Sequence, residues 1–303
     1  MNKAIPFPIF IVGMPRSGTT LVSNLLNASG EIYIPEETHF YDTLKRFKSK
    51  YSIKRNDFDE FKRYYLSDRN FALEYLNLSD KEKKLLLNYD RVHFLEELIK
   101  LKMKGSSFMR WGEKTPIHFE FFDQIKEDFP NAKFIHVIRD PRDVIPSIKK
   151  ANWAKLFPMK LLLNRYKRAA QLSIKYHCNI LTVKFEELLG NPEVITKNIY
   201  EFCGLTFRKE VLNTFYLKEN LNFSTATEPW KENNERPIDK ANAFKWKRGT
   251  SSFTIKFIGA YLGKEIKLLQ YPLSPQPIKI TYYANCLIID IIQVITYLRK
   301  GLK

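Results

Sequence analysis

One segment near the N-terminus restricts the fold of this chain more than any other: the apolar run at residues 7–12 leads directly into the loop GMPRSGTT at residues 13–20. The loop has the glycine spacing G-x-x-x-x-G, and a helical pattern follows it to Leu26. A strand, a glycine-bearing loop and a helix in this order are typical of a phosphate-binding loop, because backbone N–H groups and the helix dipole together attract a dianion. The alternative is a plain glycine turn with Thr20 at the helix start.

The loop lacks the lysine of nucleotide triphosphatases. Thr19 occupies the position at which those enzymes carry the lysine that pairs with the β- and γ-phosphates. Without that lysine, nothing in the loop itself pairs with a triphosphate. We therefore expect the loop to bind a shorter 5′-phosphate group rather than ATP or GTP.

Two later β-branched runs extend the same pattern. Residues 133–138 and 179–183 are predicted to be buried strands, and a helical pattern follows the first of them at residues 141–149. This alternation predicts an α/β fold with a P-loop-NTPase-like parallel β-sheet flanked by helices. Ligands of such sheets bind at the carboxyl ends of the strands, so we expect the chemistry just after Val12 and Ile138.

Two other regions stand apart from this sheet. Residues 41–110 hold 17 basic and 11 acidic side chains among many Tyr, Phe and Leu residues, which indicates a helical insertion on the substrate side or a solvated helical flank. A cluster of prolines then predicts a break between a domain over residues 1–272 and a C-terminal amphipathic tail over residues 273–303. We expect the tail to pack against its own domain or a second copy in a homodimer, with peripheral membrane contact as the alternative.

The charge balance indicates an anionic partner. The 303 residues include 50 Lys and Arg against 33 Asp and Glu, which gives a formal net charge of +17 and a pI near 9.6. This excess suits a phosphate-rich cosubstrate, an acidic polymer, a nucleic acid or a membrane surface, and it does not choose among them. With 44% hydrophobic residues the chain can bury a full core, which excludes disordered and collagen-like classes.

Cysteine usage indicates a reducing compartment, and the apolar runs indicate neither a secretory signal nor a membrane span. The cysteines Cys178, Cys203 and Cys286 fit neither a disulfide framework nor a zinc site, so no metal is expected. No secretory signal is evident at the N-terminus. The longest apolar stretch, residues 284–298, is interrupted by polar side chains before it reaches the roughly 20 residues that a membrane span needs. We expect a cytoplasmic protein, with membrane association as the alternative.

Two motifs resemble those of a known family. Residues 15–21, PRSGTTL, are similar to the 5′-phosphosulfate-binding loop of sulfotransferases that use 3′-phosphoadenosine 5′-phosphosulfate (PAPS). The second family motif is a strand that ends in Arg with a Ser eight positions later, and residues 134–147 resemble it through Arg139 and Ser147. The resemblance extends over residues 6–272 and is closest in motif spacing to tyrosylprotein-type and bacterial sulfotransferases.

The resemblance implies where the donor binds. The loop residues implied in binding the 5′-phosphosulfate are Arg16, Ser17, Gly18, Thr19 and Thr20. Arg139 and Ser147 would bind the 3′-phosphate, a dianion that ATP lacks, and would thereby exclude ATP. Phe185, which replaces the family's Tyr, is implied near adenine together with Lys245 and Trp246. For these three side chains, core packing and surface charge are the alternative.

Sulfuryl transfer also needs a base for the acceptor hydroxyl and positive charge at the transferring group. The spacing from Arg16 to Glu37 is similar to that of the catalytic glutamate in tyrosylprotein-type sulfotransferases, so Glu37 is expected to be the general base. His39 and Glu36 are the alternatives. The resemblance implies that Lys114 is the transition-state lysine, and Arg16 is expected to share its role.

Three functions remain open at this point. The first is transfer of a sulfuryl group from PAPS to a hydroxyl of a carbohydrate, lipid, phenol or peptide tyrosine. The second is a P-loop kinase with a degenerate loop, which would hold Mg²⁺ through Thr20 and Asp140. The third is a non-catalytic binder of anionic polymers that uses residues 144–185, where nine Lys or Arg occur without an acid. Trp153 and Tyr166 are too few aromatic residues to argue stacking on bases, so no nucleic acid is expected.

Overall fold

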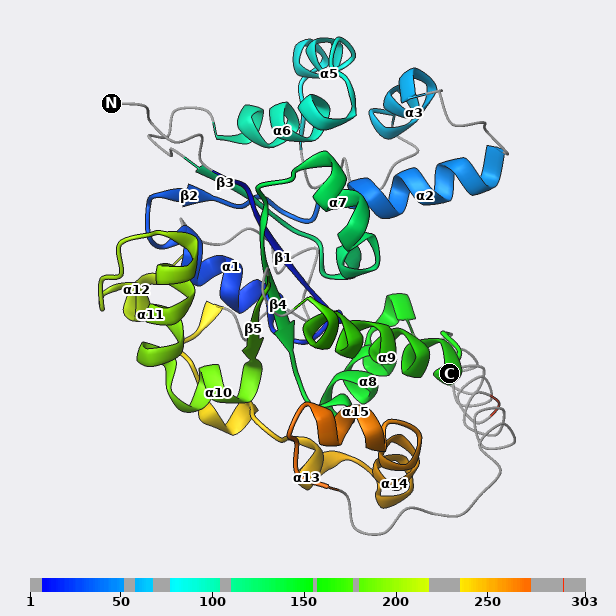
Figure 1. Ribbon diagram of the computed structural model, residues 1–303, viewed down its shortest axis with the longest axis vertical. Coiled ribbons are helices and arrows are strands. Elements are labelled where there is room, and N and C mark those ends of the chain that lie inside the picture. The colour runs from blue at the N-terminus through cyan, green and yellow to red at the C-terminus, as the bar shows by residue number, and fades with distance from the viewer. Residues whose placement is uncertain are drawn as a thin grey trace, which may run out of the picture.

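The centre of the molecule is a five-stranded sheet in the order β2-β3-β1-β4-β5, in which every pair of neighbouring strands is parallel (Figure 1). The computed structural model describes residues 7–51, 58–67, 77–103, 110–154, 157–176, 180–217, 235–273 and 291. The strands are β1 (Ile9–Gly13), β2 (Ile32–Tyr33), β3 (Arg110–Lys114), β4 (Lys133–Ile138) and β5 (Ile180–Lys184).

Helices cover both faces of this sheet. The helices that pack on one face are α1 (Thr19–Asn27), α10 (Phe185–Gly190), α11 (Pro192–Cys203) and α12 (Val211–Thr214). The other face carries α2 (Phe40–Tyr51), α3 (Phe58–Tyr65), α5 (Asp80–Leu86), α6 (Arg91–Lys102), η1 (Pro116–Phe121), α7 (Phe122–Asp128), α8 (Pro141–Lys150), η2 (Asn152–Ala154), α9 (Met159–Lys175), α14 (Ser252–Tyr261) and α15 (Gly263–Leu268). Two short elements, η5 (Lys240–Asn242) and α13 (Trp246–Gly249), lie beside α10 and the start of α8.

The central strand, β1, is apolar along its length and shows no alternation of apolar and polar residues. Ile9 and Ile11 of β1 point into one hydrophobic cluster, whereas Phe10 and Val12 point into the other. All four side chains are fully buried. A parallel strand between two helical layers has no solvent face, so it reads as a continuous apolar run.

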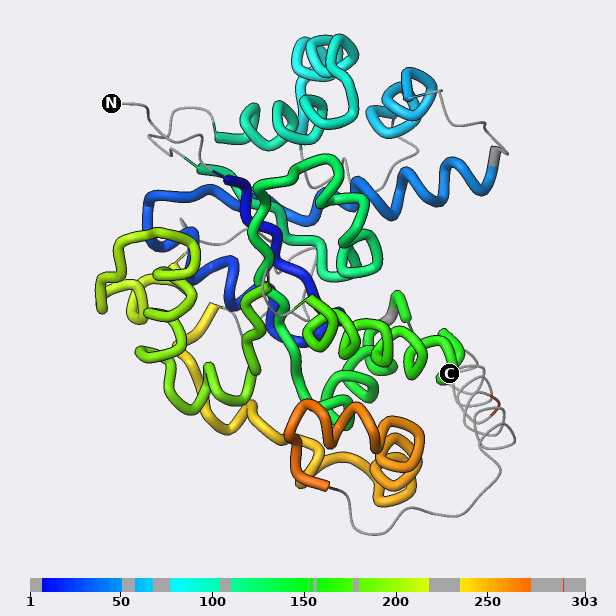
Figure 2. The backbone as a smooth tube through the Cα atoms, in the orientation of Figure 1, coloured from blue at the N-terminus to red at the C-terminus, as the bar shows by residue number. Residues whose placement is uncertain are grey.

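The register of β1 against β4 fixes the edge at which function is expected. Gly13 is paired with Val137, so the loop after β1 begins beside the end of β4. The tube in Figure 2 follows the chain from β1 into α1 and from β4 into α8 on that side of the sheet. Lys114, at the end of β3, is paired with Ile11 on the other side of β1. Three strand ends therefore meet at one edge.

The predicted fold class is confirmed. The predicted strand at residues 133–138 is β4, the run at 7–12 overlaps β1, and β5 ends one residue later than predicted. Strand β3 was not predicted, and the described residues between positions 41 and 103 lie in helices or in the segments beside them.

Some sequence-based expectations fall outside the described residues. These include Cys178, Cys286 and the predicted tail except for residues 273 and 291. The division into a domain and a tail stays a prediction. Within the residues that the structure describes, no helix is long and apolar enough to cross a membrane.

Candidate active site

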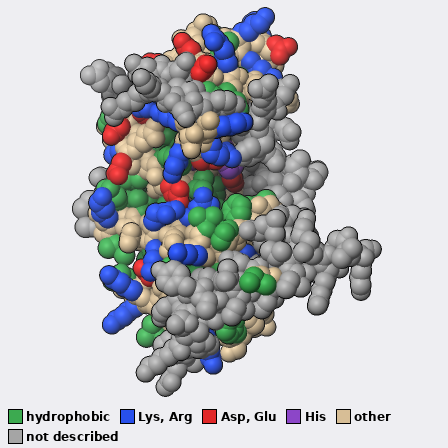
Figure 3. Space-filling view, turned by 90° about the vertical axis from the view of Figure 1, so that its right-hand side faces the viewer, with side chains coloured by type: hydrophobic (Ala, Val, Ile, Leu, Met, Phe, Trp, Pro, Cys, Tyr) green, Lys and Arg blue, Asp and Glu red, His purple; other side chains and the backbone are tan. Residues whose placement is uncertain are grey.

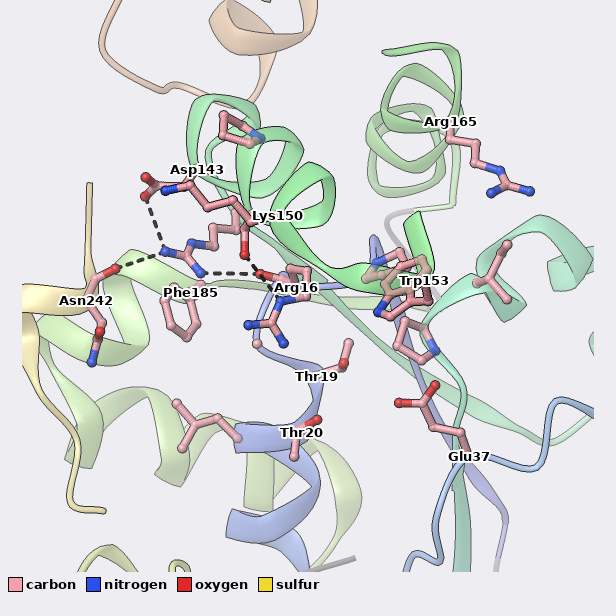
Figure 4. A pocket seen from close by; sticks show the side chains of 18 of the residues that line it. Arg16, Thr19, Thr20, Glu37, Asp143, Lys150, Trp153, Arg165, Phe185 and Asn242 are labelled. Carbon is pink, nitrogen blue, oxygen red and sulfur yellow. Dashed lines mark hydrogen bonds and ion pairs between the residues drawn. The ribbon is translucent and has the colours of Figure 1, made fainter. Parts of the chain in front are cut away.

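A cavity of about 1200 Å³ opens at the carboxyl edge of the sheet. Its wall includes the loop after β1, Arg139 after β4, and Glu37 after β2. In the close view of Figure 4, Glu37 lies across the cavity from Asn242, with Arg16 and Thr19 between them. Figure 3 shows Lys and Arg side chains gathered around the middle of one face, with acidic side chains and a histidine among them.

The loop after β1 is shaped by two glycines at which a side chain would collide. Gly13 has φ +155°, and a Cβ there would lie 2.4 Å from the carbonyl oxygen of Val137. Gly18 has φ +104°, and its Cβ would lie 2.3 Å from the ring of Phe185. These positions let the loop turn tightly against β4 and begin α1 at Thr19.

The first turn of α1 faces the cavity. Thr19, Thr20 and Leu21 all line it, and the backbone N–H groups of a first helical turn have no acceptor within the helix. Together with the helix dipole they form a site for an anion. Ser17 lies just behind, fully buried, and its Oγ has no hydrogen-bond partner within the described residues.

Arg139, which follows β4, is held at the cavity wall by several neighbours. Its guanidinium donates to the backbone carbonyls of Arg16 at 3.3 Å and Asn242 at 3.0 Å, and it pairs with Asp143 at 3.4 Å. Its Cζ lies 4.5 Å from the centre of the Phe185 ring. Its buried Nε has no hydrogen-bond partner among the described residues. The side chain is thus fixed at the cavity wall.

Arg16 connects the two motifs directly. It has φ +72°, and its Nε donates to the Oγ of Ser147 at 3.2 Å. Both residues line the cavity. The loop after β1 and the helix after β4 are therefore joined by a side-chain hydrogen bond across 131 positions of sequence.

Asp143 organises the segment on which the adenine prediction depends. Its carboxylate accepts from the backbone N–H groups of Lys245 at 3.2 Å and Trp246 at 2.6 Å. Burial raises the pKa of Asp143, and the nearby charge of Arg139 opposes this rise. Lys245 and Phe185 line the cavity, whereas the indole of Trp246 is buried with its centre 3.9 Å from the Cζ of Arg142.

Glu37 and Lys114 form an ion pair on the side of the cavity that lies across from Asn242. The Nζ of Lys114 lies 2.7 Å from the Oε1 of Glu37. Lys114 is fully buried at the end of β3, and Glu37 retains 21% of its side-chain exposure at the cavity wall. A buried ammonium needs such a carboxylate partner, so each group fixes the other.

His39 lies directly beside Glu37. Its Nε2 is 3.4 Å from the Oε2 of Glu37, and its Nδ1 is 3.3 Å from the Oδ2 of Asp42. Burial lowers the pKa of His39, but hydrogen bonds to the two carboxylates outweigh this effect and raise it to about 9. The imidazole is therefore protonated at neutral pH.

The remaining wall combines aromatic rings with cations. The aromatic residues there include Phe121, Trp153 and Phe157, of which Trp153 is 43% exposed. The cations of this part of the wall are Lys45, Arg46, Lys50, Lys150 and Arg165. Among them, Arg46 lies 3.0 Å from Asp42, and the Nε of Arg165 lies 3.4 Å from Glu120.

Of the residues singled out from the sequence, most lie in this cavity. Arg16, Gly18, Thr19, Thr20, Glu37, Arg139, Ser147, Phe185 and Lys245 line it, as do the alternatives Glu36 and His39. Ser17, Lys114 and Trp246 are buried behind the wall. Sequence reasoning considered Asp143 only as a brace at the start of the helix after Arg139, and it missed the acidic partners of the histidines. The spacing of Asp143 four residues after Arg139 on a helix is consistent with their ion pair.

No group of three or more His, Cys, Asp or Glu side chains that could hold a metal ion occurs in the described part of the chain. The prediction that no metal is needed stays a prediction.

Comparisons with known proteins identify sulfotransferases as relatives of this chain. A family model described as "Sulfotransferase family" matches residues 8–209. Protein-tyrosine sulfotransferase A of Caenorhabditis elegans is 26% identical over 222 residues, which are 70% of this chain and 53% of that protein. Protein-tyrosine sulfotransferase 1 of Danio rerio is 26% identical over 221 residues, or 70% of this chain and 57% of the relative. The chain spans about half the length of these two curated relatives.

Solved structures share the fold at low identity. The sulfotransferase domain of the Synechococcus PCC 7002 olefin synthase superimposes with a TM-score of 0.62 and 20% identity, covering 90% of this chain and 98% of that domain. The sulfotransferase domain of the curacin biosynthetic pathway gives a TM-score of 0.61 and 18% identity, covering 90% of this chain and all of the domain, 100%.

Proposed function

The chain belongs to the sulfotransferase family, and from this premise we propose that it transfers a sulfuryl group from PAPS to an acceptor hydroxyl. The observation that carries the proposal is one cavity lined by an anion-binding helix start, by Arg139 with Ser147, and by Glu37. A donor with two phosphate groups and a reactive sulfur needs these three chemistries within reach of each other.

The donor side suits a nucleotide with separate 5′ and 3′ anions. The N–H groups of Thr19 and Thr20 would receive the 5′-phosphosulfate, and Arg139 with Ser147 would receive the 3′-phosphate. Arg16 lies between the two anions and is already hydrogen-bonded to Ser147. Phe185 lines this end of the cavity and would pack near adenine.

The acceptor side would supply the base. Glu37 takes the proton from the acceptor hydroxyl while that oxygen forms a bond to sulfur. The bond between sulfur and the bridging phosphate oxygen breaks, and adenosine 3′,5′-bisphosphate leaves. Lys114 and Arg16 would stabilise the negative charge that grows on the bridging oxygen. His39 is less suited to be the base, because its imidazole already holds a proton at neutral pH.

The kinase alternative loses its acidic partner for Mg²⁺. Both oxygens of Asp140 are engaged by Arg142, with Nε at 2.8 Å and Nη2 at 2.6 Å, and the two side chains are fully buried. The polymer-binding alternative is weakened in a similar way. Several cations of residues 144–185 are paired within the protein, as in the contacts of Arg165 and Arg168 with Glu120.

The side chains at the acceptor end of the cavity would favour one class of acceptor alcohol. Trp153 and Phe157 would contact a planar or apolar body, and Lys150 and Arg165 would favour negative charge on it. Among carbohydrates, lipids, phenols and tyrosine peptides, we therefore expect aromatic alcohols that carry an anionic group to be the best acceptors.

Transfer of labelled sulfate tests this function. Purified protein is incubated with sulfur-labelled PAPS and a panel of phenols, sterols, sugars and peptides, and labelled product is measured for the wild type and for Glu37→Gln. We expect transfer by the wild type and a loss of about 10²-fold or more in Glu37→Gln, the contribution typical of a general base. Affinity for adenosine 3′,5′-bisphosphate should be unchanged. An active Glu37→Gln protein would contradict the assignment of the base.

A further inference from the structure

A chain of carboxylates and imidazoles extends from Glu37 into the protein interior. Beyond His39 and Asp42, the Nε2 of His118 lies 3.3 Å from the Oδ1 of Asp42, and its Nδ1 lies 2.9 Å from the Oε2 of Glu113. Both His118 and Glu113 are fully buried. We call His39, Asp42, His118 and Glu113 the histidine chain. Acidic and basic groups alternate along it without interruption.

Three elements and one loop supply these side chains. His39 follows β2, Asp42 lies in the first turn of α2, Glu113 is in β3, and His118 is in η1. His39 has φ +49°, a conformation that residues with a Cβ rarely adopt. The hydrogen bond from its backbone N–H to the Oγ1 of Thr115, at 3.2 Å, holds it there. Backbone strain of this kind persists where the surroundings fix it, and it gathers at functional sites.

The inner end of the chain is closed by hydroxyl groups. The Oε1 of Glu113 accepts from Thr38 at 2.8 Å and from Thr115. The ring of Tyr41 contacts His118 edge-on, with ring centres 5.3 Å apart, and the Tyr65 hydroxyl donates to the carbonyl of Thr38. Neither tyrosine ionises near neutral pH, because burial raises both pKa values.

The outer end is bounded by cations. Arg46 lies 3.0 Å from the Oδ2 of Asp42, and Lys114 lies 2.7 Å from the Oε1 of Glu37. With both imidazoles protonated, every carboxylate lies between two cations or between a cation and hydroxyl groups.

The charges along the histidine chain favour that protonated form. Burial lowers the pKa of His118, but the charges of Glu113 and Asp42 outweigh it and raise the value to about 9, as for His39. Burial would raise the pKa of Asp42 and of Glu113, yet the imidazoles hold both below their ordinary values.

We propose that the histidine chain is a positioning device for the general base: the protonated His39 holds one carboxylate oxygen of Glu37 while Lys114 holds the other. This inference rests on the proposed function of Glu37. A protonated imidazole donates to the carboxylate, whereas a neutral one could present a lone pair to it. Asp42 keeps His39 charged, and His118 with Glu113 keeps Asp42 ionised. His118 would thus act on catalysis without contacting the substrate.

The central member offers the sharpest test. Asp42→Asn keeps the shape of the side chain and removes the charge that both histidines share. We expect kcat at pH 7.5 to fall about 10- to 100-fold, as for a displaced catalytic group. The upper limb of the pH dependence of kcat should move to lower pH, and affinity for adenosine 3′,5′-bisphosphate should not change. The control is Asp59→Asn, which removes an exposed carboxylate paired with Lys62 on α3, and it should leave both measurements unchanged.

Imidazole titration by NMR provides a readout that does not depend on activity. The chain has only 5 histidines, so each signal can be assigned. In the wild type, His39 and His118 should stay protonated at neutral pH and titrate near 9, and both should shift toward 6.5 in Asp42→Asn. If both wild-type imidazoles titrate near 6.5, the proposal is wrong even if the variant does not fold.

The outcomes separate this inference from the proposed function. A wild type that transfers no sulfate to any acceptor would contradict the proposed function. A wild type that transfers sulfate, with an Asp42→Asn variant whose kcat falls equally at every pH, would contradict only the positioning role, because that result describes a merely structural residue.

Discussion

Single side chains of the donor site are held in place by their neighbours. Arg139 is fixed by a carboxylate, two backbone carbonyls and an aromatic ring, and Arg16 is fixed by Ser147. Such preorganisation lowers the entropy cost of binding an anion, because the guanidinium does not have to be ordered when the ligand arrives. The residues that do the holding are therefore as important for affinity as those that touch the ligand.

Gly18 allows a direct test at this scale. In Gly18→Ala the new Cβ would lie 2.3 Å from the ring of Phe185 at φ +104°, so both the ring and the loop must move. We expect a loss of stability of about 1–3 kcal/mol and a loss of affinity for adenosine 3′,5′-bisphosphate of tenfold or more, in line with the cost of strained backbone and overpacking. Denaturant unfolding and calorimetric titration measure the two effects.

Gly190→Ala is the matched control. A Cβ at Gly190 would meet nothing within 4 Å, so stability and affinity should stay close to those of the wild type. Equal behaviour of the two variants would contradict the close fit of the loop against Phe185.

At the scale of elements, the predictable strands were those buried on both faces. β1 and β4 are continuous apolar runs, and their sequence patterns are sufficient to predict them. β3 has the sequence RWGEK, and its last two residues are buried as partners of groups on other elements: Glu113 with His118 and Lys114 with Glu37. No local pattern indicates that Lys114 is buried, because its partner Glu37 lies 77 positions away.

The same limit explains which site residues could be predicted. Gly18, Arg139 and Ser147 belong to local motifs whose spacing carries their chemistry. Asp143 and the histidine chain depend on contacts between elements that are distant in sequence. Their role becomes visible only when the fold brings those elements together.

The start of α8 contains a buried ion pair that should contribute strongly to stability. Asp140 caps the helix through the backbone N–H of Arg142 and also pairs with its guanidinium. In Asp140→Asn we expect a loss of about 3–5 kcal/mol in the free energy of unfolding, because the guanidinium stays buried without its counter-charge.

An exposed ion pair provides the comparison for that variant. Lys209 and Glu193 lie 2.7 Å apart and are 70% and 52% exposed, so Glu193→Gln should cost less than about 1 kcal/mol. Chemical denaturation of both variants measures the difference, and similar losses would contradict the role assigned to the buried pair.

At the scale of the whole molecule, the fold brings three strand ends to one cavity in a protein with a net charge of +17. Long-range attraction would therefore favour an anionic donor before any specific contact forms. Specificity for the donor would come from its second phosphate. A general positive field would attract any nucleotide, whereas Arg139 and Ser147 should distinguish nucleotides with a 3′-phosphate from those without one.

The most direct measurement is a calorimetric comparison of adenosine 3′,5′-bisphosphate with adenosine 5′-monophosphate, for the wild type and for Arg139→Ala. We expect the wild type to bind the bisphosphate about 10- to 100-fold more tightly than the monophosphate, which corresponds to the binding free energy of one or two charge-assisted hydrogen bonds. Arg139→Ala should lose this preference, while its affinity for the monophosphate should change little. Equal affinity of the wild type for both nucleotides would contradict it.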